Sequence, residues 1–331
     1  MQVTDRRDPS MYDVVVVGGG AAGLSGALTL ARARRSVLVV DGGEPRNAPA
    51  SGVHGFLTRD GMNPAELLEA GRAEVRGYGA QIRAGQVASA ERIEDGFVIT
   101  LDDGNSVNAH RLLVATGLVD ELPNVLGLRE RWGRDVLHCP YCHGWEVRDQ
   151  ALGVLASGPW AVHQALLFRQ WTTDLTLFLH TTPQPTDEET EQLAARGIAV
   201  VEGEVSSLEV VDDHLTGIRL RSGELIARQA LVVGPRFVAH TDGLSDLGLT
   251  TIAHPLGVGE YIDADATGLT TIPGVWVAGN VADLTAVVVG AADAGVRIAA
   301  AVNADLIAED TRHAVAAHRD RMSSTAGGSR S

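Results

Sequence analysis

A glycine-rich turn lies between two apolar strands near the start of this chain and strongly limits the folds that the chain can adopt. The β-branched run 14–17 leads directly into Gly18-Gly19-Gly20-Ala21-Ala22-Gly23, which opens an Ala- and Leu-rich helical segment. A second apolar strand, 37–40, then ends at Asp41. Such an order predicts a βαβ unit, in which small residues let the backbone at the helix N-terminus approach a pyrophosphate while the acidic residue accepts from ribose hydroxyls. The turn therefore predicts a dinucleotide site rather than a merely tight strand-to-helix connection.

A second unit of the same kind begins near Ala151, with a strand at 152–156, a helix at 161–171 and a strand at 175–179. Each half then contains an excursion, that is, a pair of antiparallel strands, because alternating apolar residues flank a tight turn. The predicted excursions are 91–101 with 106–113, and 206–221 with 224–233. We therefore predict an α/β fold with two Rossmann-like, three-layer ββα dinucleotide-binding domains.

The length of 331 residues is enough for about two domains. We expect residues 12–118 and 241–313 to form one discontinuous domain, which ends with a strand at 275–278 and a helix at 286–306. Residues 119–240 form the other. Residues 1–11 and 314–331 are predicted to be disordered tails, the second because it is rich in Ala, Ser, Gly and Arg.

Charge and hydropathy exclude two classes of partner. The chain has 27 Lys and Arg against 42 Asp and Glu, a net charge of -15, which gives no electrostatic basis for binding nucleic acid. No apolar run reaches the roughly 20 residues of a membrane span, and residues 1–10 lack the apolar core of a signal peptide. We expect a cytoplasmic protein.

Only two cysteines occur, and they form the motif Cys139-Pro140-Tyr141-Cys142. A lone CxxC outside a secreted chain indicates redox chemistry, since two thiols within one turn close a disulfide and a helix start lowers a thiol pKa. Half of a zinc site is the alternative, but that site needs two more ligands, and only His138 and His143 are adjacent. We expect no metal.

Three segments together resemble the low-molecular-weight thioredoxin reductases over residues 12–309: 112–117, 138–144 and 274–280. The resemblance implies that FAD binds to the N- and C-terminal segments, while the CxxC lies on an inserted middle domain against the flavin. Asn280 replaces the acidic residue that contacts the ribityl chain in that family, and its amide can still accept and donate hydrogen bonds. The residues expected to bind FAD are Gly18, Gly20, Ala21, Ala22, Gly23, Asp41, Gly42, Arg46, Asn47, His54, Ala115, Thr116, Gly117, Gly279, Asn280, Ala286 and Val287.

The same analogy assigns roles around the CxxC. Cys139 exchanges with substrate and Cys142 faces the flavin. His143 occupies the place of an acid-base Asp, and a histidine can accept a thiol proton at neutral pH. His143 can instead simply pack beside the motif, and His138 is a weaker candidate for the base. His54 lies near the flavin by analogy, or is only a turn residue.

The second unit departs from the family where NADPH should bind. Its turn reads Ala156-Ser157-Gly158-Pro159-Trp160-Ala161, in which the first glycine is lost and Pro159 and Trp160 remove an N–H and add bulk. The next strand ends at 180–185 without an arginine to hold a 2'-phosphate. We therefore expect that NADPH is not bound.

With the segments Pro45-Arg46-Asn47 and 52–61, this combination is similar to the FAD-dependent dithiol oxidases that close the disulfides of gliotoxin, holomycin and romidepsin-type metabolites. That resemblance implies an intramolecular disulfide formed in a small natural product, with O2 as acceptor, H2O2 as product and a homodimeric enzyme. Two alternatives stay open. One is a disulfide reductase supplied by NADPH or another donor such as ferredoxin, and the other is a redox sensor that binds FAD without catalysis.

Overall fold

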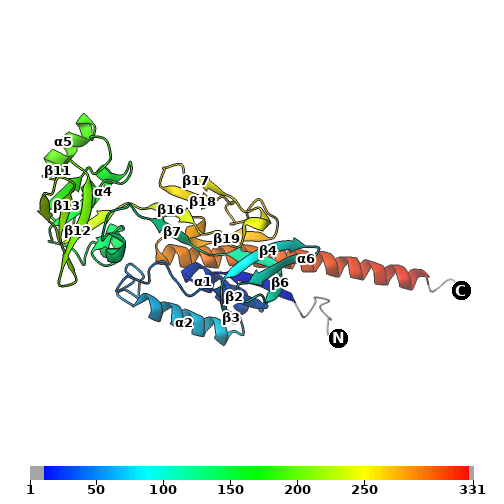
Figure 1. Ribbon diagram of the computed structural model, residues 1–331. Helices are drawn as coiled ribbons and strands as arrows, with labels where there is room; N and C mark the ends of the chain where they lie inside the picture. Colours follow the sequence, from blue (N-terminus) through cyan, green and yellow to red (C-terminus); the bar gives the residue numbers. More distant parts are fainter. Residues whose placement is uncertain (1–10, 328–331) are drawn as a thin grey trace.

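The computed structural model describes residues 11–327 and divides into two bodies of one design (Figure 1). In the first body a parallel sheet runs β3, β2, β1, β6, and β5 and β4 extend it as antiparallel strands. The short β19 also pairs in parallel with the end of β6. The bounds are β1 (Met11–Val17), β2 (Val37–Asp41), β3 (Gln81–Ala84), β4 (Val87–Ile93), β5 (Gly96–Leu101), β6 (Ser106–Val114) and β19 (Val275–Val277).

Alternation along β1 explains the layers of the first body. Val14 and Val16 face a cluster built on the helices α1 (Ala21–Arg32), α2 (Pro64–Gly77) and α6 (Val288–Gly327). Val15 and Val17 face the opposite cluster, which contains residues of β4 and β5. Both faces of the strand are buried, as expected for the centre of a parallel sheet.

The second body repeats this plan with the parallel order β11, β10, β9, β15, β8. Helices lie against one face, and the antiparallel strands β12 to β14 lie against the other. Its elements are β8 (Val136–Leu137), β9 (Leu152–Leu155), α4 (Ala161–Phe168), β10 (Leu175–Phe178), α5 (Asp187–Ala195), β11 (Ala199–Val201), β12 (Val205–Val211), β13 (His214–Leu220), β14 (Leu225–Ala227) and β15 (Ala230–Val233). The predicted fold class is confirmed.

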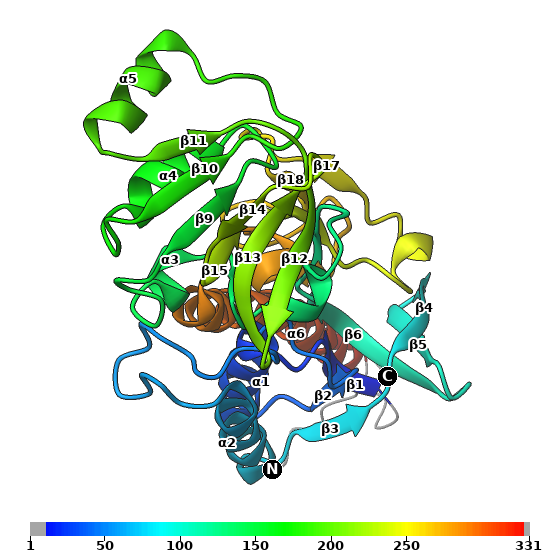
Figure 2. The ribbon, with the colours of Figure 1, turned by 60° about the vertical axis from the view of Figure 1, so that its left-hand side comes forward.

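Two adjacent strands connect the bodies. The chain leaves the first body through β7 (Leu118–Glu121) and returns through β16 (Arg236–Ala239), and these strands pair antiparallel. They share a sheet with β17 (Thr251–Ala253) and β18 (Gly259–Ile262), so both connections belong to the first body. Figure 1 shows β7 and β16 between the two bodies, and in Figure 2 the sheet of the second body lies above β1, β2 and β3 of the first. The second body is therefore a few residues shorter at each end than the predicted 119–240.

Several predicted boundaries were wrong. The strand expected at 91–101 is two strands, β4 and β5, separated by a turn at Glu94-Asp95. Met11 belongs to β1 rather than to a tail. The tail predicted at 314–331 is helical as far as Gly327. The remaining tail residues, 1–10 and 328–331, lie outside the described part of the chain.

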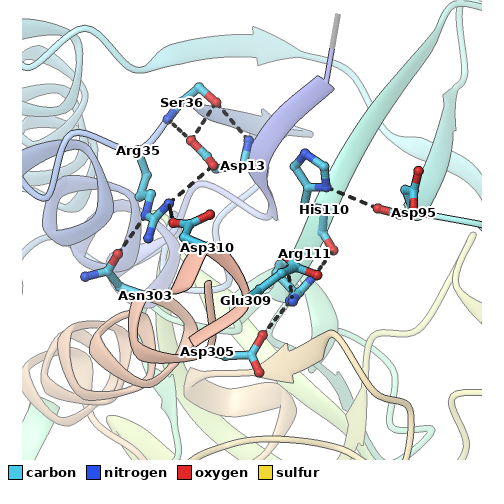
Figure 3. A network of polar contacts seen from close by, with 10 residues as sticks. All are labelled: Asp13, Arg35, Ser36, Asp95, His110, Arg111, Asn303, Asp305, Glu309 and Asp310. Atoms are coloured by element: carbon cyan, nitrogen blue, oxygen red, sulfur yellow. Dashed lines mark hydrogen bonds and ion pairs between the residues drawn. The ribbon is translucent and has the colours of Figure 1, made fainter. Parts of the chain in front are cut away.

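The length of α6 has a local explanation in its anchoring (Figure 3). Arg35 donates to Asn303 at 2.8 Å and to Asp310 at 3.0 Å, while Arg111 donates to Asp305 at 2.7 Å. These contacts fix the helix against the turn that follows α1 and against β6, and continuation from a formed helix avoids the cost of nucleation. Ala and Arg, frequent after residue 313, are strong helix formers, so the helix propagates beyond its packed part. Among the described helices, none is both long and apolar enough to cross a bilayer.

Candidate active site

A cavity of about 580 Å³ is lined by residues of both bodies. The first body contributes the turn after β1, the loop after β2 and the segment after β6. The second body contributes His138, Cys139, Cys142 and His143. The structure thus brings the glycine-rich turn and the CxxC, which are far apart in sequence, to one place.

The first glycine-rich turn is packed so tightly at Gly18 and Gly23 that side chains are excluded there. A Cβ on Gly18, whose φ is +105°, would lie 2.4 Å from the carbonyl oxygen of Ala115, and one on Gly23 would lie 1.9 Å from that of Gly18. The N-cap of α1 is Gly20, which offers its helix no side-chain hydrogen bond. The first N–H groups of α1 and its dipole therefore remain for an anion in the cavity.

Asp41 is held in place at the end of β2. Its Oδ1 accepts from the Gly19 N–H at 3.2 Å and the Gly43 N–H at 3.3 Å, and its Oδ2 accepts from Arg72 at 3.1 Å. A carboxylate fixed in this way remains able to accept from a ribose hydroxyl, because its Oδ2 has accepted only one of the two hydrogen bonds that its lone pairs allow. Arg72, on α2, also lines the cavity, and no motif in the sequence identified it.

The Asn280 side chain has fewer hydrogen-bonding atoms free for a ligand than the sequence suggested. It lies in the short 3-10 helix η3 (Gly279–Val281), and its Nδ2 donates to the carbonyls of Asp283 and Ala286, both at 2.9 Å. Because both amide hydrogens are used, the Oδ1 is the atom available to a ligand, as an acceptor.

Most residues predicted to bind FAD line the cavity. Two do not: Gly23 and Gly279 allow close packing instead, since a Cβ on Gly279 would lie 2.8 Å from that of Ala22. A turn of glycine and alanine, a helix start without a side-chain cap and a fixed carboxylate fit a dinucleotide such as FAD. The lining residues among those predicted are Gly18, Gly20, Ala21, Ala22, Asp41, Gly42, Arg46, Asn47, His54, Ala115, Thr116, Gly117, Asn280, Ala286 and Val287.

The dithiol segment follows β8, a strand that the sequence pattern did not reveal. Cys139 is the extended N-cap (φ -91°, ψ 120°) of the one-turn helix α3 (Pro140–His143), and Pro140 occupies its first position. A Cβ on Gly144 would lie 2.8 Å from the Trp171 ring, so the glycine lets this turn pack against Trp171. Both cysteines are free thiols.

The two thiols differ in acidity because of their places on the turn. A hydrogen bond from the Cys142 thiol lowers the pKa of Cys139 to about 7, assisted by the backbone N–H groups of Cys142 and Tyr141 and opposed by burial. The pKa of Cys142 is raised, because its proton is held by Cys139 and because the thiol is buried. In the reduced pair the negative charge therefore resides on Cys139.

His143 is a neutral, unengaged imidazole at the cavity wall. Within residues 11–327 neither ring nitrogen has a hydrogen-bond partner, although both are buried. Burial lowers the pKa of His143, with Glu146 opposing and His54 adding to the shift. His143 can therefore accept a proton at neutral pH.

His138 is more constrained. Its Nδ1 lies 3.2 Å from the carbonyl oxygen of Val233, and its ring meets Phe237 edge-on at 5.1 Å. Burial and then Arg46 lower the pKa of His138. Its Nδ1 donates to the carbonyl, so only the Nε2 remains to accept a proton.

Arg46 acts on the dithiol as well as lining the cavity. It makes a bidentate pair with Asp120, at 2.8 and 2.7 Å, and its guanidinium lies 5.1 Å from the centre of the Phe237 ring. Its charge contributes to the lowered pKa of Cys139. Asp120 and Phe237 also line the cavity and lie on the connecting strands, where no motif had marked them.

In the second body the corresponding turn, residues 156–161, makes hydrogen bonds within the protein. The Ser157 hydroxyl donates to the Gly234 carbonyl at 2.6 Å, and the Trp160 indole N–H donates to the Leu256 carbonyl of the first body at 2.9 Å. The segment that follows β10 contains no arginine of its own. Arg221 from another part of the second body lies close to His180 in this segment, but it pairs with Glu204 at 2.8 Å. Among the described residues, no group of three or more His, Cys, Asp or Glu side chains is arranged to hold a metal ion.

Comparison with known proteins gives consistent matches. The family model described as pyridine nucleotide-disulphide oxidoreductase matches residues 12–306. Thioredoxin reductase sirT of Leptosphaeria maculans is 30% identical, over 91% of this chain and 96% of that protein.

Among solved structures, that of HlmI has a TM-score of 0.88 and 48% identity, over 95% of this chain and 98% of the other. The structure of the oxidoreductase from Agrobacterium tumefaciens has a TM-score of 0.85 and 36% identity, over 90% of this chain and 99% of the other. The high TM-scores extend over both bodies of the molecule.

Proposed function

This chain belongs to the pyridine nucleotide-disulphide oxidoreductase family as a thioredoxin-reductase-like oxidoreductase, and from that premise we propose that it oxidises small-molecule dithiols to intramolecular disulfides. Thioredoxin-reductase-like members of the family bind FAD. The proposed acceptor of the electrons is O2, which becomes H2O2.

One contrast carries this proposal. The CxxC lines the same cavity as the dinucleotide turn of the first body, whereas Trp160, in the equivalent turn of the second body, hydrogen-bonds to Leu256. Pro159 there lacks an N–H for a pyrophosphate. A protein that exchanges electrons between a dithiol and a flavin, without a nicotinamide partner, fits this arrangement.

The residues of the chain perform the sulfur chemistry. A substrate thiolate attacks the Cys139–Cys142 disulfide, and the second substrate thiolate displaces the enzyme sulfur, so that one S–S bond forms in the product as one breaks in the enzyme. His143 takes up a proton from a substrate thiol, because its imidazole is neutral and unengaged. Cys139, stabilised as a thiolate, is the sulfur that we assign to exchange with substrate.

Bound FAD would supply the two-electron acceptor for the reduced cysteines, and O2 would be the terminal acceptor. The overall reaction balances as one dithiol and one O2 giving one cyclic disulfide and one H2O2. Its two electrons and two protons leave the dithiol and end in the peroxide.

A second candidate is a disulfide reductase supplied with electrons by NADPH. It is favoured by the preserved fold of the second body and by Arg221, a positive charge near the end of β10. In that case electrons pass from nicotinamide to the cysteines, and the dithiol is the product rather than the substrate.

Oxygen uptake distinguishes the two. Holoenzyme supplied with dithiothreitol in air is expected to consume O2 and form H2O2 at the same rate with and without NADPH. Rapid anaerobic bleaching of the flavin by NADPH alone would contradict the oxidase and support the reductase. Cys142→Ser is the control, because it removes the second sulfur and must abolish dithiol turnover under either mechanism.

A further inference from the structure

Two large aromatic side chains are exposed beside the dithiol. Tyr141, between the two cysteines, is 71% exposed, and Trp145, three residues after Cys142, is 66% exposed. Aromatic residues are scarce in this chain, at 4% of the sequence, and contact of a large ring with water is unfavourable. Two such rings next to the reacting sulfurs indicate a surface that a ligand covers.

The chain itself keeps both rings close to the sulfurs. Three residues of fully extended chain span at most about 11 Å, so the backbone of Trp145 lies within that distance of Cys142. Tyr141 is the immediate neighbour of Cys142 on the one-turn helix that Cys139 caps. A ligand of the size of a small natural product can therefore touch a ring and a sulfur at the same time.

The Trp145 ring is held in one orientation. The Arg148 guanidinium lies 4.1 Å from the centre of the indole, and its Nη1 donates to the Trp145 carbonyl at 2.6 Å. A guanidinium can cover only one face of a ring, and the exposure of Trp145 leaves most of the indole to solvent. Because this ring is fixed in advance, a ligand that stacks on it does not have to immobilise it.

Tyr141 is anchored to the core of the second body. Its ring meets the edge of Trp171 with the two centres 6.0 Å apart. Trp171 in turn lies against the fully buried Phe168, again with ring centres 6.0 Å apart. Both exposed rings are therefore supported by contacts of their own, and their positions beside the dithiol are fixed by the fold.

The exposed aromatic surface is too small for a protein partner. A buried aromatic side chain contributes roughly 150–250 Å², so the two rings together offer about 300–500 Å². A stable protein interface needs about 800 Å² on each partner. A small molecule with a flat ring matches the available area, because stacked rings gain free energy beyond that of burial alone.

We propose that Trp145 and Tyr141 form a binding surface for the ring of a small dithiol substrate, so that the enzyme selects dithiols whose sulfurs are carried by an aromatic or other planar ring system. This inference rests on the proposed oxidation of dithiols and names the class of dithiol. The substrate ring lies on the face of Trp145 opposite Arg148 while a substrate sulfur exchanges with Cys139. Trp145 is then the main determinant of specificity.

Two matched dithiols measure this selection. Ortho-benzenedimethanethiol and dithiothreitol both close a cyclic disulfide of the same ring size, but only the first carries an aromatic ring. Oxygen uptake by the holoenzyme gives kcat/KM for each, and the ratio of the two values is compared among variants, so that the intrinsic reactivities of the thiols cancel. Trp145→Ala is expected to lower the ratio, benzene compound over dithiothreitol, by about 10-fold, mainly through KM, and Tyr141→Ala by less.

Conservative and distant variants serve as controls. Trp145→Phe should retain most of the ratio because it keeps a ring, and Arg148→Ala should lower it partly because the indole is released. Tyr78→Ala should leave the ratio at the wild-type value. Tyr78 is 52% exposed and has the Arg32 guanidinium 5.0 Å from its ring centre, but it lies at the end of α2, away from the dithiol.

A second measurement does not depend on turnover. Ortho-benzenedimethanol and threitol, in which hydroxyls replace the thiols, are added while iodoacetamide alkylates Cys139 in the fully reduced holoenzyme without air. The benzene compound should slow alkylation in wild type but not in Trp145→Ala, and threitol should slow it in neither.

The opposite outcomes are distinct. A ratio and a protection that are the same in wild type and Trp145→Ala would overturn the ring-binding surface. An unchanged ratio together with a lower molecular mass of Trp145→Ala in solution would overturn it as well, and would assign the rings to contact with a second copy of the chain. Absence of oxygen uptake with dithiothreitol would overturn the oxidase instead, while protection from alkylation would still decide whether the rings bind the ligand.

Discussion

The two bodies share one plan but use equivalent positions differently. After the first strand, the first body has a turn in which Gly18 and Gly23 leave no room for a side chain, whereas the second has Pro159 and Trp160. After the short parallel strand β19 the first body places Gly279-Asn280, and after its counterpart β8 the second places the CxxC. The second body thus lines the cavity with the segment after β8 rather than with the turn that follows β9.

This difference separates fold from chemistry. A ββα body keeps its layers through buried alternating residues, which both bodies retain. Nucleotide binding depends on a few backbone positions at one turn, and residues at these positions can change without disturbing the sheet. Matched changes in the two turns are therefore the most direct way to test the comparison.

The largest effect is expected from glycine replacements in the two turns. Gly23→Ala places a Cβ 1.9 Å from the Gly18 carbonyl oxygen and should cost about 3 kcal/mol or more, with loss of bound flavin. Gly158→Ala, with no atom within 4 Å of the new Cβ, should be nearly neutral. Thermal unfolding and flavin absorbance per chain measure both. Equal losses in the two variants would remove the distinction between the turns.

Removing the base beside the dithiol should give the next largest effect. His143→Ala should slow anaerobic flavin reduction by dithiothreitol by about 10²-fold, because the substrate thiol loses its proton acceptor. Flavin content should remain at the wild-type level, since the first body holds the cofactor. His138→Ala is the matched comparison, and a larger loss there would transfer the role of base to His138.

FAD should stabilise the protein by binding to the first body, whereas NADPH should not stabilise it through the second. FAD at about 100 times its Kd should raise the unfolding free energy by about 2.7 kcal/mol relative to the apoprotein. NADPH at the same concentration should leave the melting temperature unchanged. If NADPH raised the melting temperature, and an Arg221→Ala variant lost this effect, the second body would be a nucleotide-binding body after all.

The pH dependence of the dithiol tests whether the turn of the second body lowers the pKa of Cys139. Because the pKa of Cys139 is lowered to about 7, its thiolate is half-formed near that pH, and alkylation of the reduced protein by iodoacetamide should rise through it. Below this range the rate should fall about tenfold per pH unit as the thiolate is protonated. A midpoint near 9, as for an ordinary cysteine, would contradict the effect of Cys142 and the turn.

The smallest effect is expected at the contact between the bodies. Trp160→Phe keeps an aromatic ring but removes the hydrogen bond to Leu256, a loss of about 1 kcal/mol. Proteolysis of the connecting strands should become measurably faster, with dithiol turnover retained. Unchanged proteolysis would indicate that the indole N–H does not hold the bodies together.

The two ββα bodies, the dinucleotide turn and the redox pair could be predicted from the sequence. These features depend on local patterns, namely strand alternation, glycine spacing and the isolated CxxC, which can be read without knowing which segments meet. The extent of α6 was missed because composition alone cannot distinguish a free tail from a helix propagating out of a packed one.

How the site is assembled could not be predicted from the sequence. The tertiary structure showed that the CxxC follows a strand equivalent to β19, that Arg72 and Arg46 are fixed by Asp41 and Asp120, and that His54 meets Glu146 across the two bodies. Such contacts join residues distant in sequence, and their formation depends on the packing and orientation of whole sheets. No local pattern in the chain records that orientation, so these partners became visible only in the folded molecule.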